Sequence, residues 1–153
     1  YASGRVDEAE AAWDRALELA PSWVRPYNDR AIQYRRAGHV EEAGQQLKAA
    51  LALSPMDPTT HYNHGVWYDV TGEPMLARRE YETALELDPN MPAALYNLAC
   101  SYAREGRIEK AAPFLERAIK LNPEFREEAL EDPDFDRVRD KAMFDTVVGG
   151  LED

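Results

Sequence analysis

The stretch that decides the fold runs from Pro58 to Met91 and reads PTTHYNHGVWYDVTGEPMLARREYETALELDPNM. Residues 59–70 contain no proline, and Gly72 follows them; glycine readily adopts the left-handed conformation that closes a helix. Residues 76–87 carry apolar side chains at helical spacing, and this run stops before Pro89 because proline cannot continue a helix. The stretch therefore predicts two antiparallel helices joined by a tight turn.

The same pattern returns along the chain every 34 residues. Four kinds of position recur in register, at Gly4, Gly38, Gly72 and Gly106, at Ala9, Ala43, Ala77 and Ala111, at Ala16, Ala50, Ala84 and Ala118, and at Pro21, Pro55, Pro89 and Pro123. By average usage, glycine and alanine each occupy about one position in ten or fewer, so this many matches do not arise by chance. Because one helix pair cannot bury its apolar face alone, neighbouring pairs must stack.

The order of small, aromatic and proline positions resembles the tetratricopeptide repeat family, whose period is also 34 residues. The match extends over nearly the whole chain and is close in one unit at Leu95, Leu98, Ala99, Tyr102, Ala111, Leu115, Ala118 and Pro123. The resemblance implies an all-α fold, a right-handed α-α superhelical solenoid of stacked 34-residue helix-turn-helix repeats. It also implies a protein-protein interaction scaffold.

We expect one domain over residues 1–153. Its expected parts are the second helix of a truncated repeat at 1–23, whole repeats at 24–57, 58–91 and 92–125, C-terminal capping helices at 126–148, and a tail at 149–153. The truncated repeat leads us to expect that the natural protein continues upstream. Asp132-Pro133 is expected to restart a helix, with Asp as N-cap and Pro at the first helical position. Its apolar stripe would cover the end of the array and consists of Phe135, Val138, Phe144, Val147 and Val148.

The composition and net charge of the chain limit the classes of partner that it can bind. Hydrophobic residues make up 44% of the chain, which fits a folded protein, and 18 Lys and Arg against 29 Asp and Glu give a net charge of -11. Such a surface repels phosphate backbones and anionic headgroups, so we expect no nucleic acid partner. No stretch reaches the roughly 18 apolar residues that span a bilayer, so no membrane insertion is expected. The single cysteine, Cys100, favours a reducing compartment such as the cytoplasm.

In the resembled family, the first helix of each repeat lines a concave groove, which implies a binding site for another protein or a peptide segment. The corresponding positions here are Arg25, Asn28, Ile32, Arg35 and Arg36 in the first whole repeat, Tyr62, Asn63, Val66 and Asp69 in the second, and Tyr96, Asn97, Cys100 and Arg104 in the third. An Asn amide both donates and accepts hydrogen bonds, and Tyr offers stiff apolar area. We expect a ligand with a few apolar side chains flanked by acids. In the alternative interpretation, the Asn amides only satisfy local groups.

The sequence gives less support to chaperone-tail binding, metal binding and catalysis than to a peptide-binding groove. The family's clamp of Lys, Arg and Asn on the C-terminal carboxylate of chaperone tails is not expected here. Of its five positions only Asn63 matches, and the others are occupied by Asn28, Ile32, Ala93 and Asn97, so two or more of the required cations are missing. His61 and His64 stand three residues apart, as metal ligands can, but packing is the better interpretation, and we expect no metal and no cofactor. No catalytic motif is visible, so no enzyme is expected. Two alternatives stay open: a docking arm of a larger enzyme, and self-association into a homo-oligomer through the truncated repeat.

Overall fold

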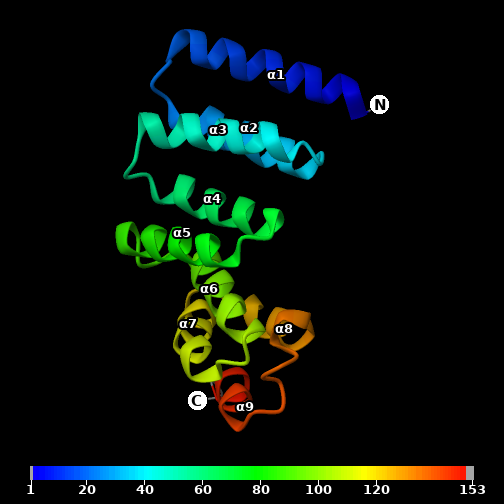
Figure 1. The fold of residues 1–153 in the computed structure, drawn as a ribbon, viewed down its shortest axis with the longest axis vertical. Helices are drawn as coiled ribbons and strands as arrows, with labels where there is room; N and C mark the ends of the chain where they lie inside the picture. The colour runs from blue at the N-terminus through cyan, green and yellow to red at the C-terminus, as the bar shows by residue number, and fades with distance from the viewer. Residues whose placement is uncertain (1, 151–153) are drawn as a thin grey trace. The chain divides into compact units, whose positions relative to one another are not determined.

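The computed structural model describes residues 2–150, without the side chains of residues 2, 3 and 6. The expected tail at 149–153 therefore lies largely outside the described residues. In chain order the elements are α1 (Ala2–Leu19), α2 (Val24–Arg36), α3 (Val40–Leu53), α4 (Pro58–Thr71), α5 (Pro74–Leu87), α6 (Pro92–Arg104), α7 (Ile108–Leu121), α8 (Glu124–Glu131), the 3-10 turn η1 (Pro133–Phe135) and α9 (Ala142–Gly149). Over residues 2–150 there is no strand, so the all-α class is confirmed (Figure 1).

The contacts divide the chain into two compact units. Unit 1 comprises Tyr1–Glu80 and unit 2 comprises Tyr81–Asp153, with the boundary inside α5. Within unit 1, α2 lies against α3, and both contact α4. Within unit 2, α6 lies against α7, which also contacts α8 and α9.

Helix α4 shows how the local sequence sets the ends of a helix. The Asp57 carboxylate accepts a hydrogen bond from the Thr60 backbone N–H at 2.7 Å, and Pro58 occupies the first turn, where its missing N–H costs nothing. The helix ends at Gly72, whose φ of 80° is left-handed. Gly38 and Gly106 also have positive φ, at 83° and 73°. These three glycines therefore form the turns between paired helices, as the 34-residue period predicts.

Gly4 departs from this pattern, because α1 runs through it. Helix α1 instead contacts α2 through Arg30, which donates to the Glu10 carbonyl at 3.4 Å and to the Asp14 carboxylate, and whose guanidinium lies 5.6 Å from the Trp13 ring centroid. Polar contacts and a cation–π contact of Arg30 thus join α1 to α2.

Small residues allow close packing in unit 1. Ala43, Ala50 and Ala77 are almost fully buried. Gly44 of α3 faces the Trp67 indole of α4, and the indole N–H donates to the Val40 carbonyl at 2.7 Å. The absence of a side chain at Gly44 therefore makes room for the Trp67 ring.

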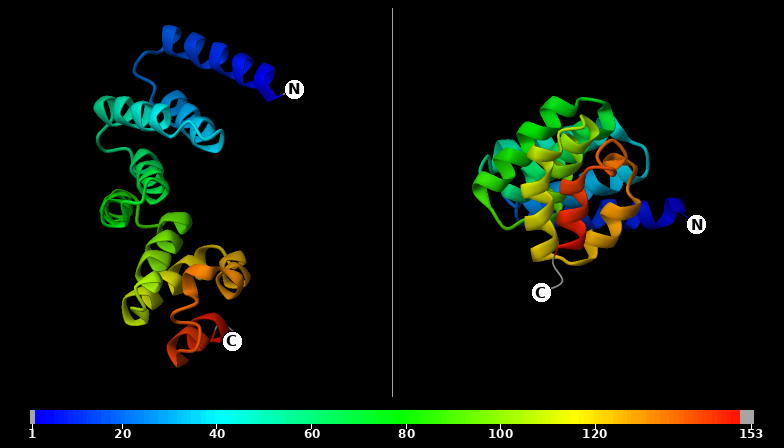
Figure 2. Two further views of the ribbon diagram at one scale, coloured as in Figure 1. Left: turned by 45° about the vertical axis from the view of Figure 1, so that its right-hand side comes forward. Right: turned by 90° about the horizontal axis from the view of Figure 1, so that it is seen from below.

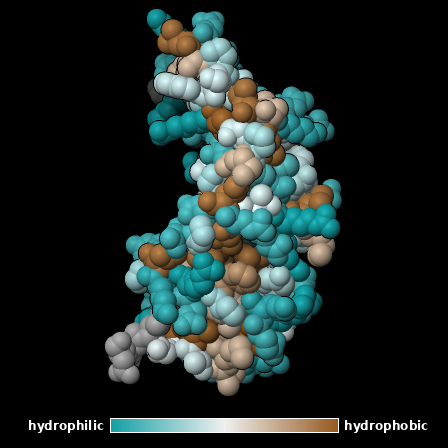
Figure 3. Space-filling model, turned by 90° about the vertical axis from the view of Figure 1, so that its left-hand side faces the viewer, coloured by the Kyte–Doolittle hydropathy of each residue, from teal (hydrophilic) through white to brown (hydrophobic). Residues whose placement is uncertain are grey.

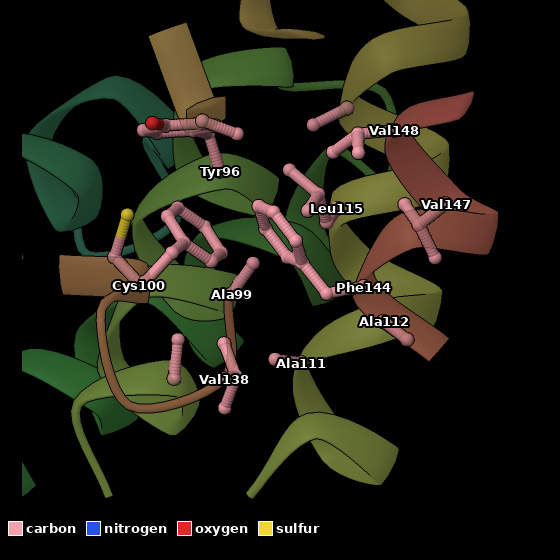
Figure 4. Close-up of a cluster of buried hydrophobic side chains, with 14 of the residues drawn as sticks. Tyr96, Ala99, Cys100, Ala111, Ala112, Leu115, Val138, Phe144, Val147 and Val148 are labelled. Atoms are coloured by element: carbon pink, nitrogen blue, oxygen red, sulfur yellow. The ribbon is translucent and has the colours of Figure 1, made fainter. Parts of the chain in front are cut away.

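The core of unit 2 is formed by α6, α7 and the C-terminal elements. Figure 4 shows the Phe144 and Val148 side chains of α9 directed toward Leu115 of α7, beside Ala99 of α6. Figure 2 shows α9 lying next to α7, in agreement with their contacts. Helix α9 therefore covers α7, while η1 lies against α6.

The C-terminal cap differs from the expected helix restart at Asp132-Pro133. Asp132 does cap a turn, accepting from the Asp134 N–H at 2.9 Å, but the turn is a three-residue 3-10 helix, and the next α-helix begins only at Ala142. Arg139 explains the break. Its guanidinium donates to the backbone carbonyls of Leu130 and of Asp132, the latter at 2.7 Å, and so satisfies the end of α8. The apolar stripe is nevertheless buried as expected.

Candidate binding groove

The predicted site residues fall into two groups. Nine lie in unit 1, with Arg25, Asn28, Ile32, Arg35 and Arg36 on α2 and Tyr62, Asn63, Val66 and Asp69 on α4. Four lie on α6 in unit 2, namely Tyr96, Asn97, Cys100 and Arg104. The two groups have different surroundings and are described in turn.

A hollow lies between α2 and α4 in unit 1 and has a volume of about 290 Å³. We call it the α2–α4 hollow; its lining residues are Val24, Arg25, Asn28, Asp29, Ile32, Asp57, Thr59 and Asn63. Four of the predicted residues therefore meet around one space. Tyr62, Val66 and Asp69 are half-buried elsewhere on α4. The other four lining residues, Val24, Asp29, Asp57 and Thr59, are not among the thirteen predicted site residues, although Asp57 carries the Asp-Pro signal that starts a helix.

A directed chain of hydrogen bonds holds the wall of the α2–α4 hollow. The Asn63 amide donates to the Asn28 carbonyl oxygen at 3.1 Å, and the Asn28 amide donates to the Thr60 hydroxyl at 2.8 Å. That hydroxyl donates to the Asp57 carboxylate at 2.6 Å. Asn28 is 4% exposed, so its amide is used inside the protein. The Asn63 carbonyl oxygen has no partner among the described residues, so it can accept a hydrogen bond from a ligand.

Of the arginines along α2, Arg25 lines the hollow, together with the carboxylates of Asp29 and Asp57. The Arg25 side chain is 90% exposed and lies 3.7 Å from the Asp29 carboxylate, a pair that solvent weakens. Arg35 and Arg36 occupy the last turn of α2. Arg25 and Arg36 are eleven residues apart. At the helical rise, this spacing is about 16 Å, so cations stand at both ends of the helix.

The molecular face in Figure 3 is mainly hydrophilic, with apolar side chains scattered among polar ones.

The predicted residues on α6 contact the chain's own C-terminal segment. The Tyr96 hydroxyl donates to the Asp132 carboxylate at 2.8 Å, and its ring stacks on Phe125 at a centroid distance of 4.5 Å. The Arg104 guanidinium donates to the Asp134 carboxylate at 2.8 Å. Sequence analysis did not foresee these intramolecular partners, because the turn at Asp132 was taken for a helix. Their role in binding another protein stays a prediction.

Burial also sets the chemistry of this region. Burial raises the pKa of Cys100 far above its usual range, and the carboxylates of Asp132 and Asp134 raise it further. The Cys100 sulfur and these two carboxylates lie within 4.8 Å of one another, as metal ligands do. However, Arg104 already balances Asp134, and a thiol that stays protonated is a poor ligand.

Asn97 donates to the Tyr81 hydroxyl at 3.5 Å.

His61 and His64 share a partner that the sequence did not suggest. The Nδ1 atoms of His61 and His64 lie 2.7 Å and 3.5 Å from the same Glu80 carboxylate oxygen. Burial by itself would raise the pKa of Glu80, but its hydrogen bonds to His64 and His61 and their charges outweigh burial and lower it. The His64 ring also lies 4.4 Å from that of Tyr68. The two histidines thus take part in the packing of α4 against α5.

Comparison with known proteins places this geometry in a class. The model of the tetratricopeptide repeat matches residues 1–58 and 62–124, so the chain belongs to the tetratricopeptide repeat family. Proteins of this family are typically non-catalytic interaction modules, and the family match and the structural neighbours support a protein-interaction scaffold. No curated protein matches the sequence at a significant level. No helix in residues 2–150 is long and apolar enough to cross a membrane.

Solved structures agree with this fold. A crystal structure of MamA superposes with a TM-score of 0.73 at 22% identity, over 96% of this chain and 85% of that one. A second MamA structure gives a TM-score of 0.72 at 22% identity, over 96% of this chain and 79% of its own. YrrB, described as a TPR protein with an unusual peptide-binding site, gives 0.70 at 25% identity, over 81% of this chain and 62% of YrrB. The predicted class of stacked tetratricopeptide repeats is therefore confirmed.

Proposed function

We propose that this scaffold binds an extended segment of a partner protein in the α2–α4 hollow. The observation that carries the proposal is the Asn63 amide. Its N–H is fixed by Asn28 at 3.1 Å, while its carbonyl oxygen is left to accept from a ligand backbone. An oriented amide is pre-organised, so binding costs little side-chain entropy.

The rest of the hollow favours a particular ligand chemistry. Ile32 offers apolar area at the wall, and the exposed guanidinium of Arg25 stands at one end. A segment with an apolar side chain flanked by Asp or Glu would complement both. The similarity to YrrB, described as having a peptide-binding site, supports a peptide as the ligand class. Affinities of about 1 μM, or about -8 kcal/mol, are expected for such a contact.

The test uses fluorescence anisotropy with a labelled peptide array in which one apolar residue is flanked by acids, basic residues or neither. Acidic peptides should bind best, and salt should weaken their binding. Asn63→Ala should weaken binding about tenfold, the equivalent of 1.4 kcal/mol. Asn97→Ala is the matched control, because Asn97 holds the same repeat position but donates to Tyr81. Equal losses in both variants, or a preference for basic peptides, would contradict the proposal.

A further inference from the structure

An apolar slot on unit 2 takes no part in the proposed peptide site. Three apolar side chains from successive helices form it, Leu85 of α5, Leu98 of α6 and Phe114 of α7, and it has a volume of about 270 Å³. Glu82 and Glu86 complete its lining from α5. They are four residues apart, so they share one helix face. We call this feature the unit 2 slot.

The slot is pre-formed by contacts behind it. Leu98 is almost fully buried and forms the base, while Leu85 and Phe114 are half-buried against the core of unit 2. The Phe114 ring is stacked on Tyr102 at a centroid distance of 6.0 Å and an interplanar angle of 7°. The Tyr102 hydroxyl donates to the Glu82 carboxylate at 3.4 Å. Fixed walls lower the entropy cost of inserting an apolar side chain.

The chain also displays an apolar group of matching chemistry. Trp23, in the loop between α1 and α2, is 61% exposed, and Leu19 nearby is 80% exposed. Arg25 follows two residues after Trp23 with a side chain that is 90% exposed. Large aromatic side chains and arginine are the residues that most often dominate protein interfaces. A cation beside an exposed indole is complementary to an apolar slot lined by two carboxylates.

We infer that Trp23 of one copy inserts into the unit 2 slot of a second copy, with Arg25 meeting Glu82 and Glu86. The exposed indole gains apolar burial, and both carboxylates gain a cation that they lack within the slot. Trp23 and the slot are different surfaces, so the contact is heterologous. An open row of copies keeps one unused Trp23 and one unused slot, so it adds further copies as the concentration rises until its two ends meet and close a ring. This inference does not depend on the peptide site proposed above.

Sedimentation velocity across a concentration range tests the inference on the full chain. Wild type should form species of increasing size, whereas Trp23→Ala and Glu86→Lys should each weaken association by about tenfold or more. Both replaced side chains are exposed, so circular dichroism should show unchanged helix content. Met56→Ala and Glu116→Lys are the matched controls, since Met56 is a 70% exposed residue of the next inter-repeat loop and Glu116 lies outside the slot.

A mixture of the two interface variants tests directly whether Trp23 of one copy pairs with the slot of another. Trp23→Ala keeps an intact slot and Glu86→Lys keeps an intact Trp23, so an equimolar mixture should form a 1:1 dimer and nothing larger. Asn63→Ala, which weakens the peptide site, should leave self-association unchanged. A monomeric wild type at all concentrations would overturn the inference, as would losses in the controls equal to those in the interface variants. Failure of the mixture to dimerise would also overturn it.

Discussion

Replacing Gly44 by alanine tests the packing between α3 and α4. A Cβ atom at this position would lie 2.6 Å from Cζ2 and 2.9 Å from Cε2 of Trp67, closer than real Cβ contacts come. The indole cannot easily retreat, because its N–H donates to the Val40 carbonyl at 2.7 Å. Either the ring gives up this hydrogen bond or the two helices separate.

Two opposing effects set the magnitude of the change. In a helix interior with free space, Gly→Ala raises the free energy of unfolding by about 1 kcal/mol. An added methyl group in a filled site costs about 1 to 3 kcal/mol. We therefore expect Gly44→Ala to lower the free energy of unfolding by about 1 kcal/mol. In a Trp67→Leu background the clash is absent, and the same substitution should be neutral or stabilising by up to about 1 kcal/mol.

Urea unfolding followed by circular dichroism measures both effects. The four proteins of the double-mutant cycle should show a coupling free energy of about 1 to 2 kcal/mol between positions 44 and 67. Gly4→Ala is the control, because a Cβ atom there meets nothing within 4 Å, and it should not destabilise. If Gly44→Ala stabilised the protein equally in both backgrounds, the reasoning about the indole would be wrong.

Three further predictions concern other parts of the chain. The pKa of Glu80 in the folded protein lies below its ordinary 4.5. The ionised Glu80 carboxylate therefore stabilises the folded protein above pH 4.5, and this stabilisation is lost as the pH falls through the lowered pKa. Glu80→Gln should thus lose less stability than wild type in acid, in unfolding measured against pH, and an identical pH profile would contradict this. Phe135→Ala removes a fully buried ring and should cost about 3 to 5 kcal/mol in urea unfolding, with faster hydrogen exchange in α9; a loss below 1 kcal/mol would show that the cap is not anchored there. Because burial and the Asp132 carboxylate raise the pKa of Cys100, its thiol should react slowly with a disulfide reagent at pH 8, and Asp132→Asn should speed the reaction about tenfold or more; equal rates would argue against the carboxylate.

Much of the fold could be predicted from the sequence. The helix predicted at 59–70 is observed as α4, Pro58–Thr71, and the one predicted at 76–87 as α5, Pro74–Leu87. Such ends are set locally, by a capping carboxylate, a proline in the first turn and a left-handed glycine. Gly4 was misleading, because α1 continues through it without a turn. The break after Asp132 was missed because Arg139, seven residues later, supplies the hydrogen bonds that stop the chain from continuing as helix.

The candidate site could be predicted only in part from the sequence. The repeat position of Asn63 was enough to place it beside a hollow, but the same reasoning treated Asn28 as a ligand group. Asn28 stands one position earlier in its repeat, and that offset directs its amide to Thr60 and buries it. Tyr96 likewise occupies a groove position, yet its hydroxyl binds Asp132. Which polar groups remain free depends on residues 32 to 36 positions away, and no local pattern reports such contacts.

The sequence by itself determined the repeat, the helix pairs, their turns and the family, because each depends on backbone preferences within a few residues and on a period of 34. Tertiary structure decided which predicted side chains face a hollow and which are covered, through contacts such as Asn28 with Asn63 and Arg104 with Asp134. It also paired His61 and His64 with one carboxylate and gave the Trp67 indole the space left by Gly44. These outcomes depend on atoms from different helices meeting within a few ångströms, so they follow from packing and not from periodicity.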